Sequence, residues 1–278
     1  MKKYYYLFRI KHYFKNFIIF TPILFVENNI NYLSISELIK VFFVFCLVAS
    51  LVYIYNDILD INSDKKHPRK KNIKPIANGQ ILTNEAYNII ILLILFISLI
   101  LYFNQNLISI VMAYIIINYL YSNYFKKIII LDIFVLSSNY LIRVIAGCIG
   151  LGVPLSIWMG ATIFSGALFL SAIKRKQELF LYGTKSRNVL KFYSIKGLKL
   201  FSTFAALSSI LFYTSYVITV NQKLLLTVPL VIYGIFRYNY LSNSRNFTDS
   251  PIDEIINDKQ NIVLIFVWMI IVIFERLN

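Results

Sequence analysis

Acidic residues and cysteines are scarce in this chain. Only 13 of its 278 residues are Asp or Glu, against 28 Lys and Arg, and there are two cysteines. Cys46 and Cys148 both lie in apolar runs, so we expect them to be small buried hydrophobes that indicate neither a metal site nor a redox compartment. The sequence contains no P-loop, no His-Glu-x-x-His and no Cys-x-x-Cys pair. It also lacks a Gly/Ser-rich linker, which favours a single domain over residues 1–278.

Apolar residues dominate instead. The chain is 58% hydrophobic with a mean hydropathy of +0.67, and its apolar runs approach the ~20 residues that a helix needs to cross a bilayer. Lipid cannot satisfy unpaired backbone groups, so the spanning segments are expected to be helices. The sequence predicts an all-α, polytopic membrane protein with about nine transmembrane helices. The expected ranges are 10–26, 37–57, 84–103, 107–124, 129–150, 155–174, 196–220, 223–241 and 260–276.

The basic residues are distributed unevenly along these ranges. Most lie before the first expected span or in the connections after the second, fourth, sixth and eighth. The positive-inside rule assigns these segments, and with them the N-terminus, to the cytoplasm. The net charge of +15 is then explained by topology and anionic lipid, and no nucleic-acid partner is expected. The first apolar stretch has no small-residue cleavage site, so it does not resemble a secretory signal peptide.

The most informative segment follows the second expected span. Asp57, Asp60 and Asp64 recur at helical spacing beside Asn56, so they share one face of a helix. Carboxylates this close repel one another, and Mg²⁺ would relieve that repulsion while filling its shell with phosphate oxygens. The basic loop that follows is suited to hold the remaining phosphate; its candidates are Arg69, Lys70 and Lys74. The alternative is a solvated, charge-balanced loop, which explains the lysines but not three acids on one face.

A second polar stripe lies in the fifth expected span. Asp132, Asn139 and Arg143 are separated by seven and four residues on an otherwise apolar helix. A lone arginine inside the membrane is costly, so the stripe is expected to face a polar cavity. The alternatives are an Asp132 that reaches the interface and an Arg143 that forms a structural ion pair or hydrogen bond.

Two basic clusters complete the candidate residues. Lys174 and Arg175 end the sixth span next to Glu178, and this cluster is either a helix-end anchor or a binding patch for a second anion. Arg9 and Lys15 precede or begin the first span. Most of that cluster is expected to serve topology and lipid contact, with one or two side chains touching substrate phosphate.

These residues resemble a known family. Asn56-Asp57-x-x-Asp60-x-x-x-Asp64 is similar to the first signature of the UbiA-type intramembrane prenyltransferases, and the detail looks most like the decaprenyl-phosphate phosphoribosyltransferase branch. Further similar segments are His67-Pro68, 74–79, Lys15-Asn16, Leu141-x-Arg143-x-x-Ala146-Gly147, Lys174-Arg175-x-x-Glu178-Leu179 and 250–259. Aromatic prenyltransferases of this superfamily carry a second Asp-x-x-x-Asp at the end of the sixth span. Three cations and one acid stand there in this chain, which suits two anionic substrates.

The resemblance implies a helical bundle around a central cavity open to the cytoplasm, in an integral protein of the bacterial inner membrane. It implies Mg²⁺-dependent transfer of 5-phosphoribose from phosphoribosyl diphosphate to a polyprenyl phosphate. The three aspartates would hold Mg²⁺, and Arg69, Lys70 and Lys74 would bind the diphosphate or the 5-phosphate. Lys174, Arg175 and Arg143 would position the lipid phosphate. Two alternatives stay open: prenyl transfer to an aromatic or other acceptor, and non-catalytic transport; a homo-oligomer is also compatible.

Overall fold

The structure is a computed structural model that describes residues 2–25, 32–66, 70–185, 187–243 and 257–277. These residues form helices and connecting turns, with no strand among them, as the sequence predicts. The chain divides into two compact units. Unit 1 contains residues 1–23, 28–125 and 142–154, and unit 2 contains residues 24–27, 126–141 and 155–278. Each unit is described by itself, and whether they form the single domain expected from the sequence stays a prediction.

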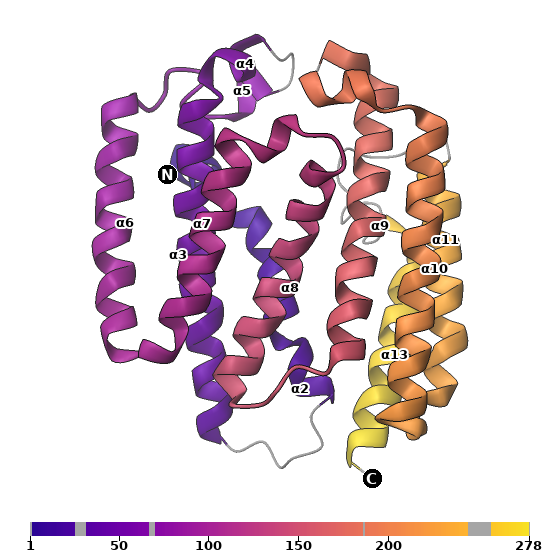
Figure 1. The fold of residues 1–278 in the computed structure, drawn as a ribbon. Helices are drawn as coiled ribbons and strands as arrows, with labels where there is room; N and C mark the ends of the chain where they lie inside the picture. Colours follow the sequence, from indigo (N-terminus) through magenta and orange to yellow (C-terminus); the bar gives the residue numbers. More distant parts are fainter. Residues whose placement is uncertain (1, 26–31, 67–69, 186, 244–256, 278) are drawn as a thin grey trace. The chain divides into compact units, whose positions relative to one another are not determined.

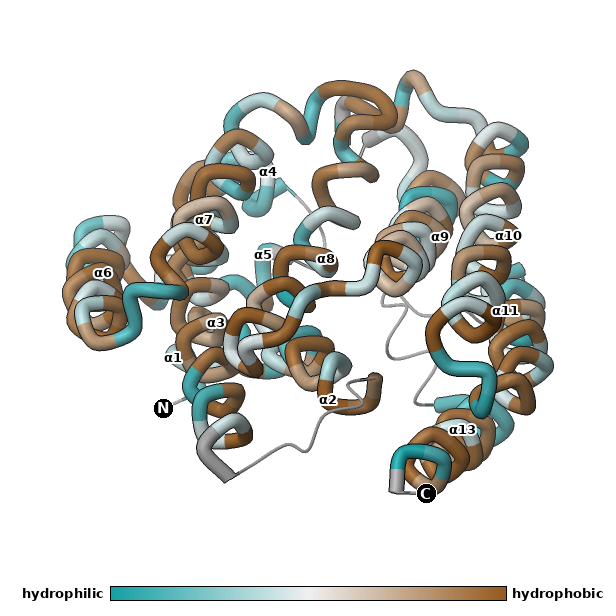
Figure 2. The backbone as a smooth tube through the Cα atoms, turned by 60° about the horizontal axis from the view of Figure 1, so that its bottom comes forward, coloured by the Kyte–Doolittle hydropathy of each residue, from teal (hydrophilic) through white to brown (hydrophobic). Residues whose placement is uncertain are grey.

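Unit 1 is built around one long apolar helix, α3 (Figure 1). Helix α3 carries apolar residues on every face, and its Val44, Phe45 and Val48 are fully buried in the core of the unit. Its elements are α1 (Lys2–Leu7), the 3₁₀ segment η1 (Ile10–Phe20), α3 (Tyr32–Leu59), α4 (Ile61–Lys66), α5 (Lys70–Ile73), α6 (Thr83–Phe103), η2 (Gln105–Leu107) and α7 (Ile108–Asn123). The short helices α4 and α5 lie beyond one end of α3, and they are hydrophilic where α3 is hydrophobic (Figure 2).

Helix α6 shows why the unit requires a membrane. Leu92, Leu95 and Leu99 recur along this helix and are each more than half exposed. A contiguous apolar surface of this kind is unfavourable in water and is normal against lipid. The exposed face of α6 is therefore the expected lipid-contacting face.

Helix α8 (Leu131–Leu151) begins in unit 2 and ends in unit 1. In its second half, Gly147 lies against η1. A Cβ atom built on Gly147 would come within 2.1 Å of the backbone oxygen of Ile19. A backbone atom cannot rotate away as a side chain can, so a residue without a side chain is needed at this close approach.

Unit 2 consists of long apolar helices packed side by side (Figure 1). Its elements after α8 are α9 (Ile157–Tyr182), η4 (Gly183–Lys185), η5 (Asn188–Phe192), α10 (Ile195–Thr219), η6 (Gln222–Thr227), α11 (Val228–Ser242) and α13 (Lys259–Leu277). The core between α9, α10 and α11 includes Phe169, Ala205 and Tyr238. The rings of Phe169 and Tyr238 meet edge to face with centroids 5.7 Å apart, which joins α9 to α11.

Within the described residues, seven helices are long and apolar enough to cross a membrane. They correspond to the second to eighth ranges expected from the sequence. The ninth range is α13, a helix of 19 residues, and the count of nine is not confirmed. The first expected range contains no single long helix up to its last described residue. It begins as η1 and continues as the five-residue α2 (Thr21–Phe25), so one continuous α-helix was the wrong expectation there.

Candidate active site

The acidic end of α3 lies in unit 1, and its first and third aspartates converge on one lysine. Asp57 and Asp64 are both 2% exposed. The ammonium of Lys74 lies 2.8 Å from Asp57 Oδ1 and 2.5 Å from Asp64 Oδ2. The helical hydrogen-bond pattern continues past the end of α3, because Asp60 N donates to Asn56 O and Asp64 N donates to Asp60 O. The two carboxylates therefore point to the same place, as their spacing predicts.

A second cation meets Asp57 from the N-terminal segment. The guanidinium of Arg9 lies 2.5 Å from Asp57 Oδ1 and 4.7 Å from the ring centroid of Tyr53, one helical turn earlier. Arg9 has left-handed backbone angles, with φ 51° and ψ 49°, directly before η1. This conformation is unfavourable for a residue with a Cβ. Sequence reasoning grouped Arg9 with topology residues, and no local pattern marks its contact with Asp57.

The other residues of this motif are placed as follows. Asp60 is partly exposed and Asn56 is partly buried. The Oδ1 atom of Asn56 is buried and has no hydrogen-bond partner among the described residues. Lys70 begins α5, with only its backbone described, and Arg69 lies outside the described residues.

The donor set suits a hard divalent cation. Among the described residues, no three acidic, histidine or cysteine side chains are grouped closely enough to enclose a metal ion. Mg²⁺ does not require such a cage, since it commonly takes one or two carboxylates and completes its shell with water and substrate phosphate. Asp57 and Asp64 already share one cationic group, the Lys74 ammonium, and the buried Asn56 oxygen is a further hard donor nearby in sequence. The residues present therefore fit a magnesium ion.

A polar group in the interior of unit 1 surrounds Arg143, on α8. Arg143 is 3% exposed. Its Nε donates to Asn16 Oδ1 and its terminal nitrogen donates to Tyr114 Oη, each at 2.7 Å. The guanidinium also lies over the Tyr114 ring, 4.9 Å from the centroid. The sequence predicted that Arg143 faces a polar cavity or, alternatively, forms a structural ion pair or hydrogen bond. The structure shows hydrogen bonds, and the cavity stays a prediction. No sequence pattern indicated Tyr114.

Asn139, Lys15 and Asp132 are the remaining members of the two predicted clusters. Asn139 is buried and donates to the carbonyl of Val135 within α8. Lys15 is partly exposed on η1, next to Asn16. Asp132 is engaged in unit 2, so the expected stripe is divided between two sets of contacts.

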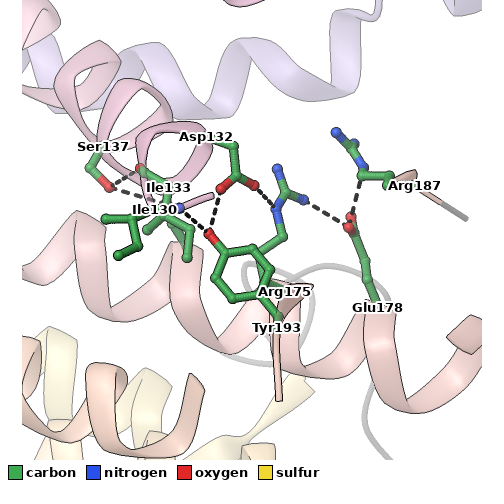
Figure 3. A network of polar contacts seen from close by, with 9 residues as sticks. Ile130, Asp132, Ile133, Ser137, Arg175, Glu178, Arg187 and Tyr193 are labelled. Atoms are coloured by element: carbon green, nitrogen blue, oxygen red, sulfur yellow. Dashed lines mark hydrogen bonds and ion pairs between the residues drawn. The ribbon is translucent and has the colours of Figure 1, made fainter. Parts of the chain in front are cut away.

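In unit 2, Arg175 is the centre of an ion-pair network (Figure 3). Its Nε donates to Asp132 Oδ2 at 2.6 Å, and a terminal nitrogen donates to Glu178 Oε2 at 2.7 Å. Arg187 reaches the same Glu178 oxygen at 3.3 Å. Arg175 and Asp132 are 1% and 0% exposed. The predicted phosphate ligand Arg175 is thus a buried cation already held by two carboxylates.

Tyr193 connects the segment before α10 to this network. Its hydroxyl donates to Asp132 Oδ1 at 2.6 Å and accepts from the backbone N–H of Ile130 at 2.7 Å. Burial, followed by the hydrogen bond to Asp132, raises the pKa of the Tyr193 phenol. The phenol therefore stays protonated and remains a donor at neutral pH. Tyr193 was not predicted, because its partner is 61 residues away in sequence.

The neighbours of Arg175 complete the basic cluster at the end of α9. Lys176 is 7% exposed and donates to Asn243 Oδ1 at 3.0 Å. Lys174 is partly exposed on the same helix. Glu178 pairs with Arg175 and Arg187. Internal contacts thus engage much of the cationic patch.

The long apolar helices define the class: this is an integral membrane protein, and buried carboxylates in it share one cationic group. The UbiA prenyltransferase family model matches residues 21–251. The chain belongs to the UbiA prenyltransferase family and is a transferase of that family.

Curated relatives agree with this assignment. The chain is 35% identical over 213 residues to a decaprenyl-phosphate phosphoribosyltransferase of Mycolicibacterium smegmatis, covering 74% of this chain and 67% of the relative. It is 32% identical to the protein of that name from Mycobacterium tuberculosis, covering 74% and 70%. A solved UbiA homolog from Archaeoglobus fulgidus, bound to DMAPP and Mg²⁺, superposes with a TM-score of 0.72 at 17% identity. That superposition covers 99% of this chain and 96% of the homolog, and it supports the fold.

Proposed function

We propose that the protein transfers 5-phosphoribose from phosphoribosyl diphosphate to a polyprenyl phosphate and releases pyrophosphate. The observation that carries the proposal is the convergence of Asp57 and Asp64 on one cationic group in a chain that is similar to decaprenyl-phosphate phosphoribosyltransferases. Two anionic substrates require cations near both phosphate groups. Within unit 1, Lys74 and the buried Arg143 supply such cations.

In this reaction, the bond from C1 of the ribose to the diphosphate oxygen breaks, and a lipid phosphate oxygen bonds to C1. Asp57, Asp60 and Asp64, with the buried oxygen of Asn56, would hold Mg²⁺, which would neutralise the charge that develops on the departing pyrophosphate. Lys74 would bind a diphosphate oxygen as a point charge. The lipid phosphate is already an anion at neutral pH, so positioning and charge stabilisation are the main tasks of the protein.

The polar group around Arg143 is the second part of the proposal. Its guanidinium is fixed by Asn16 and Tyr114. The planar guanidinium is suited to bidentate contacts with a phosphate group. Arg143, with Lys15 nearby in sequence on η1, would attract a phosphate group of one substrate. The polyprenyl chain would lie against the apolar helices in lipid.

The decisive assay supplies the purified protein with Mg²⁺, a polyprenyl phosphate and labelled phosphoribosyl diphosphate. We expect a labelled lipid product and one pyrophosphate for each transfer. The Asp57→Asn variant should lose at least about a hundredfold in rate, as expected when a fixed charge stabiliser is removed. Glu85→Gln, an exposed acid in the first turn of α6, is the matched control and should keep the wild-type rate.

Three results would contradict the proposal. Transfer from labelled prenyl diphosphate to an aromatic or other acceptor, without use of phosphoribosyl diphosphate, would indicate the alternative reaction suggested by the family. Solute flux across sealed vesicles without pyrophosphate release would indicate transport. Wild-type turnover by Asp57→Asn would remove the assigned role of the carboxylates.

The orientation in the membrane belongs to the same proposal. The Asp57 site would face the cytoplasm of a bacterial inner membrane, because the basic connections share its side of the expected topology. Cysteine labelling by an impermeant reagent tests this. A cysteine introduced at the exposed Lys71 should react in inverted vesicles and stay protected in right-side-out vesicles.

A further inference from the structure

The carboxylates of the candidate metal site are already neutralised by side chains of this chain. Asp57 and Asp64 carry two negative charges and are almost fully buried. Arg9 and Lys74 bring two positive charges to the same oxygens, at 2.5–2.8 Å. Buried carboxylates without a counter-charge are strongly unfavourable, so these two residues, the counter-cation pair, stabilise the site in the absence of metal.

In each ion pair, the cationic side chain is more exposed to solvent than the carboxylate. The side chains of Arg9 and Lys74 are 21% and 14% exposed, against 2–3% for the aspartates. A cation that arrives from solvent must therefore displace them before it reaches the carboxylate oxygens. An anion that arrives from solvent meets the two cations first.

The two cations also come from segments outside α3. Arg9 lies between α1 and η1, and Lys74 lies directly after α5. Lys74 has a flexible four-carbon stem, and Arg9 has a second contact in the face of the Tyr53 ring. Both can therefore move away from the carboxylates without unwinding α3, which carries Asp57, or α4, which carries Asp64.

We propose that Arg9 and Lys74 act as built-in counter-cations that prevent a divalent cation from binding alone and make its binding depend on an anionic diphosphate. A divalent cation added by itself would place four positive charges against two negative ones. A diphosphate supplies new acceptors for Arg9 and Lys74 and frees the aspartate oxygens for the metal. Metal and diphosphate then bind together, each increasing the affinity for the other by the same factor. This inference rests on the proposed function.

Equilibrium dialysis of the purified full-length protein against Mn²⁺ tests the inference, with inorganic pyrophosphate as the anionic probe. Wild type should bind Mn²⁺ at least tenfold more tightly with pyrophosphate than without it. Lys74→Met should bind Mn²⁺ alone about tenfold more tightly than wild type, which corresponds to ~1.4 kcal/mol, and should depend less on pyrophosphate. Arg9→Met should change in the same direction with a smaller effect, because Lys74 contacts both aspartates whereas Arg9 pairs with Asp57.

Two further variants separate charge from folding. Lys74→Arg retains the positive charge and should bind Mn²⁺ alone as weakly as wild type does. Lys71→Met removes an exposed lysine from the same segment and should behave as wild type. Thermal unfolding gives an independent readout: Lys74→Met should melt lower than wild type in chelator, and Mn²⁺ alone should restore more of its stability than it adds to wild type.

The inference is overturned if folded Lys74→Met binds Mn²⁺ alone no more tightly than wild type. It is equally overturned if wild type binds Mn²⁺ with the same affinity in the presence and absence of pyrophosphate, a measurement that needs no variant. Failure of the proposed function is a different result. The dialysis then shows coupling between metal and pyrophosphate, while phosphoribosyl diphosphate gives no lipid product.

Discussion

The Asp132–Arg175 pair is expected to contribute more to stability than any exposed ion pair of this protein. Exposed pairs contribute little, about 0–1 kcal/mol, because water screens them. Asp132 and Arg175 are 0% and 1% exposed, so removal of either partner takes away a counter-charge that water cannot replace. Asp132→Asn tests this with little change in shape, and an asparagine oxygen can still accept from Tyr193.

The expected magnitude follows from the remaining contacts. Breaking a buried pair costs about 3–5 kcal/mol, and the lower end applies here because Glu178 still contacts Arg175. For a chain of this size, a loss of ~3 kcal/mol lowers the melting temperature by about 6–12 °C. Thermal unfolding of the purified protein, followed by tryptophan fluorescence or circular dichroism, measures the shift. A control, Lys40→Met, removes a lysine from an exposed pair with Glu37 and should melt near wild type.

A double variant distinguishes a buried ion pair from general damage to packing. Replacing both charges, as in Asp132→Leu with Arg175→Met, removes the buried charge that each single variant leaves without this partner. The double variant should therefore be more stable than the sum of the single effects implies, with a coupling energy of about 0.5–3 kcal/mol. If Asp132→Asn melts at the wild-type temperature, or if the two single effects simply add, the assigned electrostatic role is wrong.

Three shorter predictions concern other sites. Gly147→Ala should destabilise the protein by about 1–3 kcal/mol in thermal unfolding, because its Cβ would meet the backbone of Ile19. Gly152→Ala is the comparison: a Cβ there meets no atom within 4 Å, so this variant measures only the cost of placing a side chain on a backbone with φ +70°. Arg237 lowers the pKa of Asp258 by a hydrogen bond, so the stability advantage of wild type over Asp258→Asn should be full above pH ~4 and should shrink as the pH falls through the lowered folded pKa. Arg143→Met should fold yet weaken binding of a phosphate-bearing substrate in dialysis, whereas unchanged binding would assign Arg143 a purely structural role.

The sequence predicted the helical class and the positions of the long spans because length and hydropathy alone decide them. Asp57 and Asp64 were predicted to share a face, since their spacing is a property of one helix and needs no tertiary information. The first range failed as a single helix. Its composition is apolar enough for a span, but the close approach of η1 to Gly147 and the left-handed Arg9 depend on packing that hydropathy does not report.

The partners of the charged residues were the least predictable feature. Arg175 pairs with Glu178 three residues along the same helix, which local spacing allows, and also with Asp132 on another helix, which local spacing does not reveal. Local spacing reports which residues can meet within one helix. It does not report which of them the tertiary fold will bury, and burial decides which pairing has the larger energetic consequence.

The scarcity of acids gives these pairings their functional meaning. In a chain with 13 acids and 28 cationic residues, each buried carboxylate meets an excess of possible counter-charges, and Asp57 has two of them. An acidic cluster in such a chain is not a ready metal site, because protein cations compete for the same oxygens. A substrate that brings its own negative charge reverses that competition. The excess of basic residues, which topology explains in general, would thereby make metal binding at the Asp57 site depend on a phosphorylated substrate, as we propose.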